Sequence, residues 1–157
     1  NYLKKRSIDP SYLKVELTES AVMDNIEIAS RQLHTLKEGG IHIALDDFGT
    51  GYSSFAYLAQ LPISTLKIDK SFIDTVCEID SHSHIVKAIS NLAHVLGMSV
   101  TAEGIETQEQ FNFLVENRID TLQGYLLSKP ITKEEILHNL TALIPFFLPE
   151  KALAYSI

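Results

Sequence analysis

The stretch IHIALDDFGTGYSS, residues Ile41–Ser54, decides the fold. Its first residues alternate, with isoleucine and leucine on one side, which is the pattern of a half-buried β-strand. This strand delivers two adjacent carboxylates, Asp46 and Asp47, into a glycine-bearing loop. Neighbouring carboxylates repel each other unless a cation lies beside them. Asp and Gly are also common turn residues, so this stretch alone leaves a metal site and an ordinary turn open.

The composition is that of one globular domain. The chain has 157 residues, of which 45% are hydrophobic and 21% charged, enough to bury a core and unlike a disordered segment. Its net charge of -7 argues against sequence-independent binding to a nucleic-acid polymer or an anionic membrane. The one cysteine cannot form an internal disulfide, and no apolar run reaches transmembrane length. We therefore expect a cytoplasmic domain, alone or within a larger protein, without direct membrane insertion.

Predicted strands and helices alternate along the whole chain. Besides the strand at 41–46, strands are expected at residues 13–18, 65–69, 99–103 and 121–125. Helices are expected at residues 25–37, 55–58 and 85–96, after a capping box at Thr107–Gln110, and after a second capping box at Thr132 and Glu135. The segment with His82 and His84 is expected to be a solvated loop. The alternation predicts a parallel sheet with right-handed crossovers.

The polar residues of the strands distinguish two such architectures. One face of every strand is apolar, and the other carries polar groups near the C-terminal end, namely Glu16, Asp46, Lys67, Asp69, Glu103 and Gln123. A doubly wound sheet is apolar on both faces, whereas a TIM-type (β/α) barrel opens one face into a site at its C-terminal mouth. Burying several ionisable groups passively is costly, so they predict a metal site there. Because a closed barrel needs eight strands, we expect an incomplete barrel, either a fragment or one that pairs with another chain.

Five segments, in order, resemble the signatures of the EAL domain family. They are ELTES at 16–20, DDFGTGYSS at 46–54, LKID at 66–69, AEGIET at 102–107 and QGY at 123–125. The resemblance runs from about Tyr12 to Pro130. Members of the family are bacterial phosphodiesterases that hydrolyse cyclic di-GMP to linear pGpG. We expect residues 1–142 to form the partial barrel, and the apolar tail at 143–157 to pack on it or at a dimer contact.

The resemblance implies a role for each matching residue. The implied metal ligands are Glu16, Asp46, Asp47 and Glu103, and the implied catalytic residues are Lys67, Glu103 and Gln123. Glu19 is implied to anchor the loop formed by Gly49, Thr50 and Gly51, with Asp69 and Glu106 in supporting positions. Hard oxygen ligands suit Mg²⁺ or Mn²⁺, and the family implies two such ions. It also implies a homodimer, and regulatory or GGDEF-type domains in the parent protein.

Two parts of the family pattern are absent from the 157 residues. One is the Glu-Ala-Leu motif, whose glutamate is a metal ligand, and the other is an asparagine on the following strand. The resemblance therefore covers the C-terminal two-thirds of the domain, without its N-terminal strands. We expect this chain to bind metal weakly and hydrolyse poorly unless a partner chain supplies the missing groups. The alternative is a degenerate module that binds cyclic di-GMP or a protein partner without catalysis.

Overall fold

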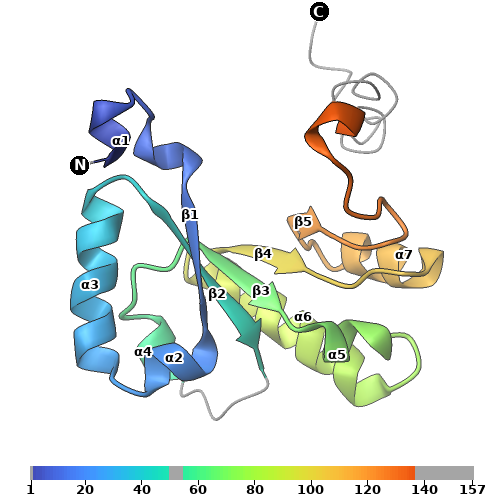
Figure 1. The fold of residues 1–157 in the computed structure, drawn as a ribbon. Helices are drawn as coiled ribbons and strands as arrows, with labels where there is room; N and C mark the ends of the chain where they lie inside the picture. Colours follow the sequence, from blue (N-terminus) through green and yellow to red (C-terminus); the bar gives the residue numbers. More distant parts are fainter. Residues whose placement is uncertain (1, 50–54, 137–157) are drawn as a thin grey trace, which may run out of the picture.

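A five-stranded parallel sheet forms the centre of the computed structural model, which describes residues 2–49 and 55–136 (Figure 1). The strands are β1 (Lys14–Thr18), β2 (His42–Phe48), β3 (Thr65–Ile68), β4 (Ser99–Ala102) and β5 (Thr121–Leu122). Each strand pairs with the next along the chain, in the order β1-β2-β3-β4-β5. The predicted parallel sheet is confirmed. The predicted apolar tail at 143–157 lies outside the described residues.

Helices connect the strands and cover the sheet. They are α1 (Tyr2–Lys5), the 3-10 helix η1 (Pro10–Tyr12), α2 (Glu19–Met23), α3 (Ile26–Glu38), α4 (Phe55–Leu58), α5 (Lys70–Asp74), α6 (Asp80–Val95) and α7 (Gln108–Glu116). Helix α3 packs against β2, and α6 packs against β3 and β4 (Figure 1). Within the described parts of the chain, no helix is long and apolar enough to cross a membrane.

The core lies between the sheet and the long helices. Leu45, Leu66 and Val100 are neighbours in register on β2, β3 and β4, and all three are buried. Leu33 of α3 and Val86 of α6 are buried with them in the same cluster. Each such side chain contributes roughly 1.5–3 kcal/mol when fully removed from water. The alternation of the strands thus assigns one face of the sheet to the core.

Side-chain caps mark the helix ends that the sequence predicted. The Thr107 side chain accepts a hydrogen bond from the Gln110 N–H at 3.2 Å, and the Gln110 side chain accepts one from the Thr107 N–H at 3.0 Å. The equivalent pair at Thr132 and Glu135 has distances of 3.3 Å and 2.7 Å. Both predicted capping boxes are confirmed, and each satisfies two N–H groups that a helix start leaves unpaired.

The structure differs from the predicted boundaries where local signals are weak. Helices α2 and α5, which the sequence did not predict, span five residues each and are too short for a 3.6-residue period to show. Helix α6 begins at Asp80, so His82 and His84 are helical rather than part of a loop. Its N-cap, Ile79, makes no side-chain capping bond, so the sequence carries no start signal. Strand β5 ends at Leu122, before the predicted end at residue 125.

Strand β2 is longer than predicted and contains a β-bulge. Leu45 pairs with Leu66, and Phe48 pairs with Ile68, so two residues of β2 lie opposite one residue of β3. The two residues of the bulge are Asp46 and Asp47, and Asp47 has a φ of 55°. Because of the extra residue, Phe48 returns to the core face, where it is 2% exposed. The bulge thus lets two consecutive aspartates precede a buried phenylalanine within one strand.

Candidate functional site

The site is centred on Lys67 of β3, whose side chain is only 9% exposed. Its Nζ lies 2.7 Å from Glu16 Oε2, 3.0 Å from Asp46 Oδ2 and 2.9 Å from Glu103 Oε1. These carboxylates belong to β1, to β2 and to the residue that follows β4. The C-terminal ends of neighbouring parallel strands meet at one edge, so four residues predicted from strand parity converge there. We call these four residues the Lys67 cluster.

Small side chains occupy the strand positions next to the cluster. In register, Glu16 lies beside Ala44, Ala44 beside Thr65, and Thr65 beside Ser99. The hydroxyl oxygens of Thr65 and Ser99 are 3.0 Å apart and hydrogen-bonded. Lys67 itself lies beside Thr101 of β4. The two hydroxyl groups of this row thus satisfy each other beside the cluster.

Burial and charge have opposite effects on Lys67. Burial by itself lowers its pKa, but hydrogen bonds to Glu16, Glu103 and Asp46 outweigh that effect and raise the pKa above its usual range. The ammonium is therefore a permanent cation of the site at physiological pH. The carboxylates are more open to water, with 45% of Glu16, 26% of Asp46 and 28% of Glu103 exposed. Three carboxylates around one ammonium leave a formal charge of about -2, which favours a further cation.

The chemistry of these donors fits a hard divalent ion. Carboxylate oxygens are the ligands that Mg²⁺ and Mn²⁺ prefer, and one such ion matches the formal charge left by the Lys67 cluster. Among the described residues, no group of three or more His, Cys, Asp or Glu side chains is arranged to hold an ion. The Lys67 ammonium is the group on which Glu16, Asp46 and Glu103 converge. The carboxylates are thus of the type that binds Mg²⁺ or Mn²⁺. In this structure the Lys67 ammonium lies at their centre.

Asp47 and the loop after it are held by hydrogen bonds from two directions. The exposed Asp47 donates its N–H to Asp46 Oδ1 at 3.0 Å, which orients the cluster's carboxylate. The Gly49 N–H donates to Oε2 of Glu19 at 3.0 Å, and Glu19 is 3% exposed. The predicted loop residues Thr50 and Gly51 lie outside the described residues. Glu19 therefore connects α2 to the end of the bulged strand.

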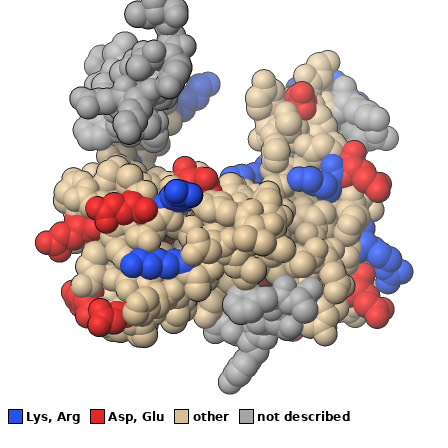
Figure 2. All heavy atoms as spheres, turned by 180° about the vertical axis from the view of Figure 1, so that it is seen from behind, with Lys and Arg blue, Asp and Glu red and all other residues tan. Residues whose placement is uncertain are grey.

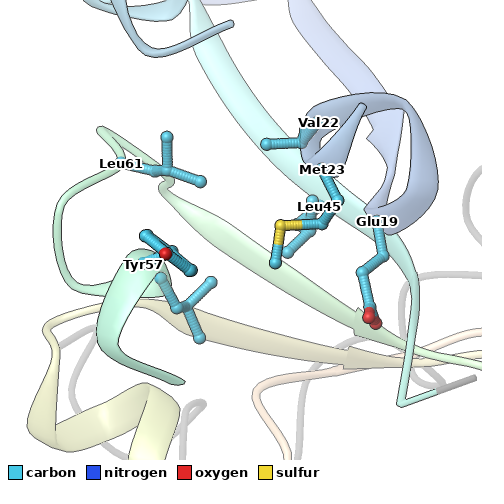
Figure 3. A pocket seen from close by; sticks show the side chains of 7 residues that line it. Glu19, Val22, Met23, Leu45, Tyr57 and Leu61 are labelled. Atoms are coloured by element: carbon cyan, nitrogen blue, oxygen red, sulfur yellow. The ribbon is translucent and has the colours of Figure 1, made fainter. Parts of the chain in front are cut away.

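Glu19 lies at one end of a small, mostly apolar pocket (Figure 3). The pocket is lined by Glu19, Val22, Met23, Leu45, Tyr57, Leu58 and Leu61. In the part of the chain that the structure describes, Glu19 Oε1 is buried without a hydrogen-bond partner. An unsatisfied buried acceptor costs roughly 1–3 kcal/mol. The bond from the Gly49 N–H to the other oxygen offsets part of this cost, so the carboxylate and the loop hold each other.

Three predicted site residues have other surroundings. Asp69 was expected on the polar strand face, but it is the N-cap of α5 and accepts hydrogen bonds from the Ser71 N–H at 2.9 Å and from the Ser71 hydroxyl. Its strand ends one residue earlier than predicted. Glu106 is half-exposed and pairs with Lys70, with 2.7 Å between Nζ and Oε1. Gln123 is exposed just after β5, where its backbone N–H donates to Ala102 O at 2.9 Å.

Lys70 is the residue of this region that the sequence did not single out. Its aliphatic stem lies over Gly104, where a Cβ would come within 2.4 Å of Lys70 Cγ. Gly104 has a φ of 78° and directly follows Glu103. Lys70 therefore packs on the loop that carries one carboxylate of the Lys67 cluster. The only available signal was the charge itself, because helix α5 was not predicted.

Comparison with known proteins gives the family. The EAL domain model matches residues 1–130. The chain belongs to the EAL domain family. Over 133 residues it is 45% identical to the signaling protein YkoW of Bacillus subtilis, covering 85% of this chain and 17% of that protein. Over 137 residues it is 42% identical to the bifunctional diguanylate cyclase/cyclic di-GMP phosphodiesterase MucR of Pseudomonas aeruginosa, covering 87% and 20%. This EAL chain thus spans about a fifth of these relatives' length.

Solved EAL structures share the fold. The PaMucR phosphodiesterase in complex with c-di-GMP superposes with a TM-score of 0.82 at 41% identity, over 85% of this chain and 54% of that one. The manganese/cyclic-di-GMP complex of Klebsiella pneumoniae BlrP1 gives a TM-score of 0.76 at 30% identity, over 82% and 33%. The predicted fold class is confirmed, and the sheet and its helices form part of the TIM-type barrel of an EAL domain.

Proposed function

We propose that this EAL chain takes part in the metal-dependent hydrolysis of cyclic di-GMP to linear pGpG. The proposal is carried by the convergence of Glu16, Asp46 and Glu103 on Lys67 at the C-terminal edge of the sheet. Enzymes built on (β/α) barrels have their active sites at this edge. The substrate is supported by the similar MucR, which is named as a cyclic di-GMP phosphodiesterase and was solved in complex with c-di-GMP.

The proposed cofactor is Mg²⁺ or Mn²⁺, in a site of two ions when the domain is complete. The residues that would hold it are Glu16, Asp46, Asp47 and Glu103. When bound, such ions lower the pKa of a water molecule and stabilise charge on phosphoryl oxygens. The manganese complex of the similar BlrP1 supports a divalent ion. Charge supports it as well, because a dianionic dinucleotide is repelled by a cluster with a formal charge of about -2.

The remaining roles belong to the chain's own side chains. Lys67 keeps its proton, orients the three carboxylates and offers a fixed positive charge to a phosphoryl oxygen. Glu103 and Gln123 are proposed to hold the side from which water attacks. Glu19 restrains the end of the bulged strand through the Gly49 N–H. Asp69 and Glu106 support the site indirectly, through the start of α5 and the Lys70 ion pair.

The partners proposed are a second copy of the chain and further domains of a parent protein. Within the described residues, β1 and β5 are the outer strands of the sheet, and unpaired strand edges need cover. Regulatory or GGDEF-type domains are supported by the lengths of the relatives, of which this chain spans about a fifth. On the rear face, Lys and Arg side chains lie among acidic and uncharged ones instead of forming one continuous basic surface (Figure 2). The described part of this face thus has no continuous basic surface of the kind that binds a nucleic-acid polymer.

The proposal is tested by following pGpG formation from cyclic di-GMP with Mn²⁺. The 157-residue chain is compared with Glu103→Ala and with Glu109→Ala, a matched control because Glu109 is an exposed carboxylate in the first turn of α7. We expect turnover that Glu103→Ala abolishes and Glu109→Ala preserves. Equal turnover in all three would contradict the proposed site.

Absence of turnover in the chain itself leads to a second assay. The chain is then joined to the N-terminal part of the MucR EAL domain, which restores the Glu-Ala-Leu strand, and the Glu103→Ala comparison is repeated. Turnover that depends on Glu103 supports the proposed site. If the joined protein binds labelled cyclic di-GMP but does not cleave it, the non-catalytic binding module is the correct function.

A further inference from the structure

We propose that Gln110 is a positioning residue for Glu106, because its side chain joins the loop that carries Glu106 to helix α5. The proposal rests on the proposed function, in which Glu106 supports the site. Gln110 lies in the first turn of α7, where it is the N3 residue of the capping box, and it is only 6% exposed. A glutamate would complete a capping box equally well. The box alone therefore does not account for a buried amide at this position.

The buried amide of Gln110 forms hydrogen bonds through both of its polar atoms. Its oxygen, Oε1, accepts the N–H of Glu106 at 2.8 Å and the N–H of Thr107 at 3.0 Å. Its nitrogen, Nε2, donates to Ile73 O at 3.1 Å and to Asp74 O at 3.4 Å, at the C-terminal end of α5. A carboxylate has no hydrogen to donate, whereas an amide can make both sets of bonds. We call these four bonds the Gln110 bridge.

Other contacts restrain the same loop on the side of β5. The Ile105 N–H donates to Gln123 O at 3.2 Å, and Ile105 O accepts the N–H of Leu126 at 3.0 Å. These bonds hold the loop as far as Ile105, which is fully buried. Glu106 is the next residue, and its N–H donates to Gln110 instead. The Gln110 bridge therefore adds a restraint from the side of α5, at the residue whose carboxylate is proposed to support the site.

Lys70 joins the same helix to the same loop, but its contact is exposed to water. Its Nζ lies 2.7 Å from Glu106 Oε1, and the two side chains are 51% and 50% exposed. Such exposed pairs lose side-chain entropy in any one geometry and are screened by salt. Lys70 begins α5 and Asp74 ends it, so the Gln110 bridge holds the other end of this five-residue helix. The buried bridge thus sets the distance between helix and loop over which the exposed pair forms.

Hydrogen exchange in the metal-free chain tests the bridge directly. Gln110→Glu keeps the acceptor of the capping box but removes both bonds to α5. Gln108→Glu is the matched control, because it makes the same chemical change at an exposed position of the same helix. The Val76 N–H donates to Ile73 O at 3.3 Å, and we expect its exchange to be about tenfold faster in Gln110→Glu only, because local opening governs it. Gln110→Met serves if the glutamate variant does not fold. Unchanged Val76 exchange in a folded Gln110 variant, or an equal rise in Gln108→Glu, overturns the inference.

A double-mutant cycle on pGpG formation tests whether Gln110 acts through Glu106. We expect kcat/KM to be about tenfold lower in Gln110→Glu, as for a displaced positioning group, and unchanged in Gln108→Glu. Because the effect passes through Glu106, we expect Gln110→Glu to cause no further loss in a Glu106→Gln background. Losses that multiply, or full turnover in Gln110→Glu, contradict the positioning role.

A chain without turnover is replaced in this cycle by the joined protein with the restored Glu-Ala-Leu strand. If that protein forms no pGpG either, the proposed function fails, and with it the role of Gln110 in catalysis. The exchange of the Val76 amide, which needs neither metal nor substrate, still decides whether Gln110 holds α5 to the loop.

Discussion

Lys67 and Lys70 are three positions apart and both contact acidic side chains, yet their surroundings differ. Lys67 is 9% exposed and touches three carboxylates within 3.0 Å. Lys70 is 51% exposed, with Glu106 Oε1 at 2.7 Å and Asp74 Oδ1 at 3.8 Å. The pKa of each lysine is raised, for Lys70 chiefly by the hydrogen bond to Glu106. Water screens the Lys70 pairs more strongly than the Lys67 ammonium, which is only 9% exposed, so contacts of similar length differ in energy.

The acidic partners of the two lysines also come from different parts of the fold. Each carboxylate at Lys67 comes from a different part of the sheet edge, so the ammonium ties the ends of neighbouring strands together. Lys70 pairs with Asp74 of its own helix and with Glu106 of an adjacent loop. Its aliphatic stem also packs over Gly104, where it fills the space that a Cβ would need. We infer that the charge of Lys67 is essential to its region, and that the stem of Lys70 matters more than its charge.

The largest effect that this comparison predicts is for Lys67→Met. The change leaves three carboxylates facing one another without a cation, and breaking a buried ion pair costs about 3–5 kcal/mol. We expect a value near the lower end, about 3 kcal/mol, because Glu16 remains 45% exposed and can turn toward water. Urea unfolding followed by circular dichroism measures the loss. A variant as stable as the unmodified chain would show that the cluster does not hold the strands together.

The pH dependence of the free energy of unfolding at alkaline pH distinguishes Lys67 from Lys70. Because the pKa of Lys67 is raised in the folded chain, its contribution is complete below the unfolded value of about 10.4. Above that pH the unfolded chain releases the proton first, so the free energy of unfolding falls by up to about 1.4 kcal/mol per pH unit. Urea unfolding between about pH 9 and 11.5 measures the slope for the chain, Lys67→Met and Lys70→Met. Slopes that are equal in the chain and in Lys67→Met would contradict the comparison.

Sequence reasoning predicted the Lys67 cluster through strand parity. Alternation is a local property, and parallel pairing brings residues at corresponding strand ends together without further information. The bulge escaped prediction because it depends on the pairing register of two separate segments: Leu45 with Leu66, and Phe48 with Ile68. Either strand alone is compatible with regular alternation. The expected end of the strand at Asp46 was therefore wrong. The contact between Phe72 and Gly49 could not be predicted either, because it joins two segments that are distant in the sequence.

The boundary of β3 shows how one residue changes a predicted role. Alternation placed Asp69 beside Lys67 on the polar face, but β3 ends at Ile68 and Asp69 caps α5. Aspartate is a preferred N-cap residue, so its position at the end of a predicted strand is compatible with either role. Only the five-residue helix after it decides between the two, and a helix this short has no detectable period.

Substitution of Asp69 tests whether this residue belongs to the Lys67 cluster or only to helix α5, which carries Lys70. If it acts as a cap, Asp69→Ala lowers the free energy of unfolding by about 1 kcal/mol, and Asp69→Ser restores most of it because serine also caps helices. Urea unfolding measures both variants, and Mn²⁺ binding is measured beside it. Normal Mn²⁺ affinity in a stable Asp69→Ser variant assigns the residue to the helix. Weakened affinity in that variant would assign it to the Lys67 cluster instead.

The smallest effect is expected for Lys70→Met. Methionine keeps an unbranched stem over Gly104 but removes the charge, and half-exposed pairs of this kind contribute little that survives in salt. We therefore expect a urea midpoint indistinguishable from that of the unmodified chain at high salt, with Glu106→Gln behaving alike. Lys70→Ala, which also removes the stem, is expected to be the less stable of the two lysine variants. If Lys70→Met instead lost as much stability as Lys67→Met, burial would not be what separates the two lysines, and the Lys70 pair would have to be included in the functional site.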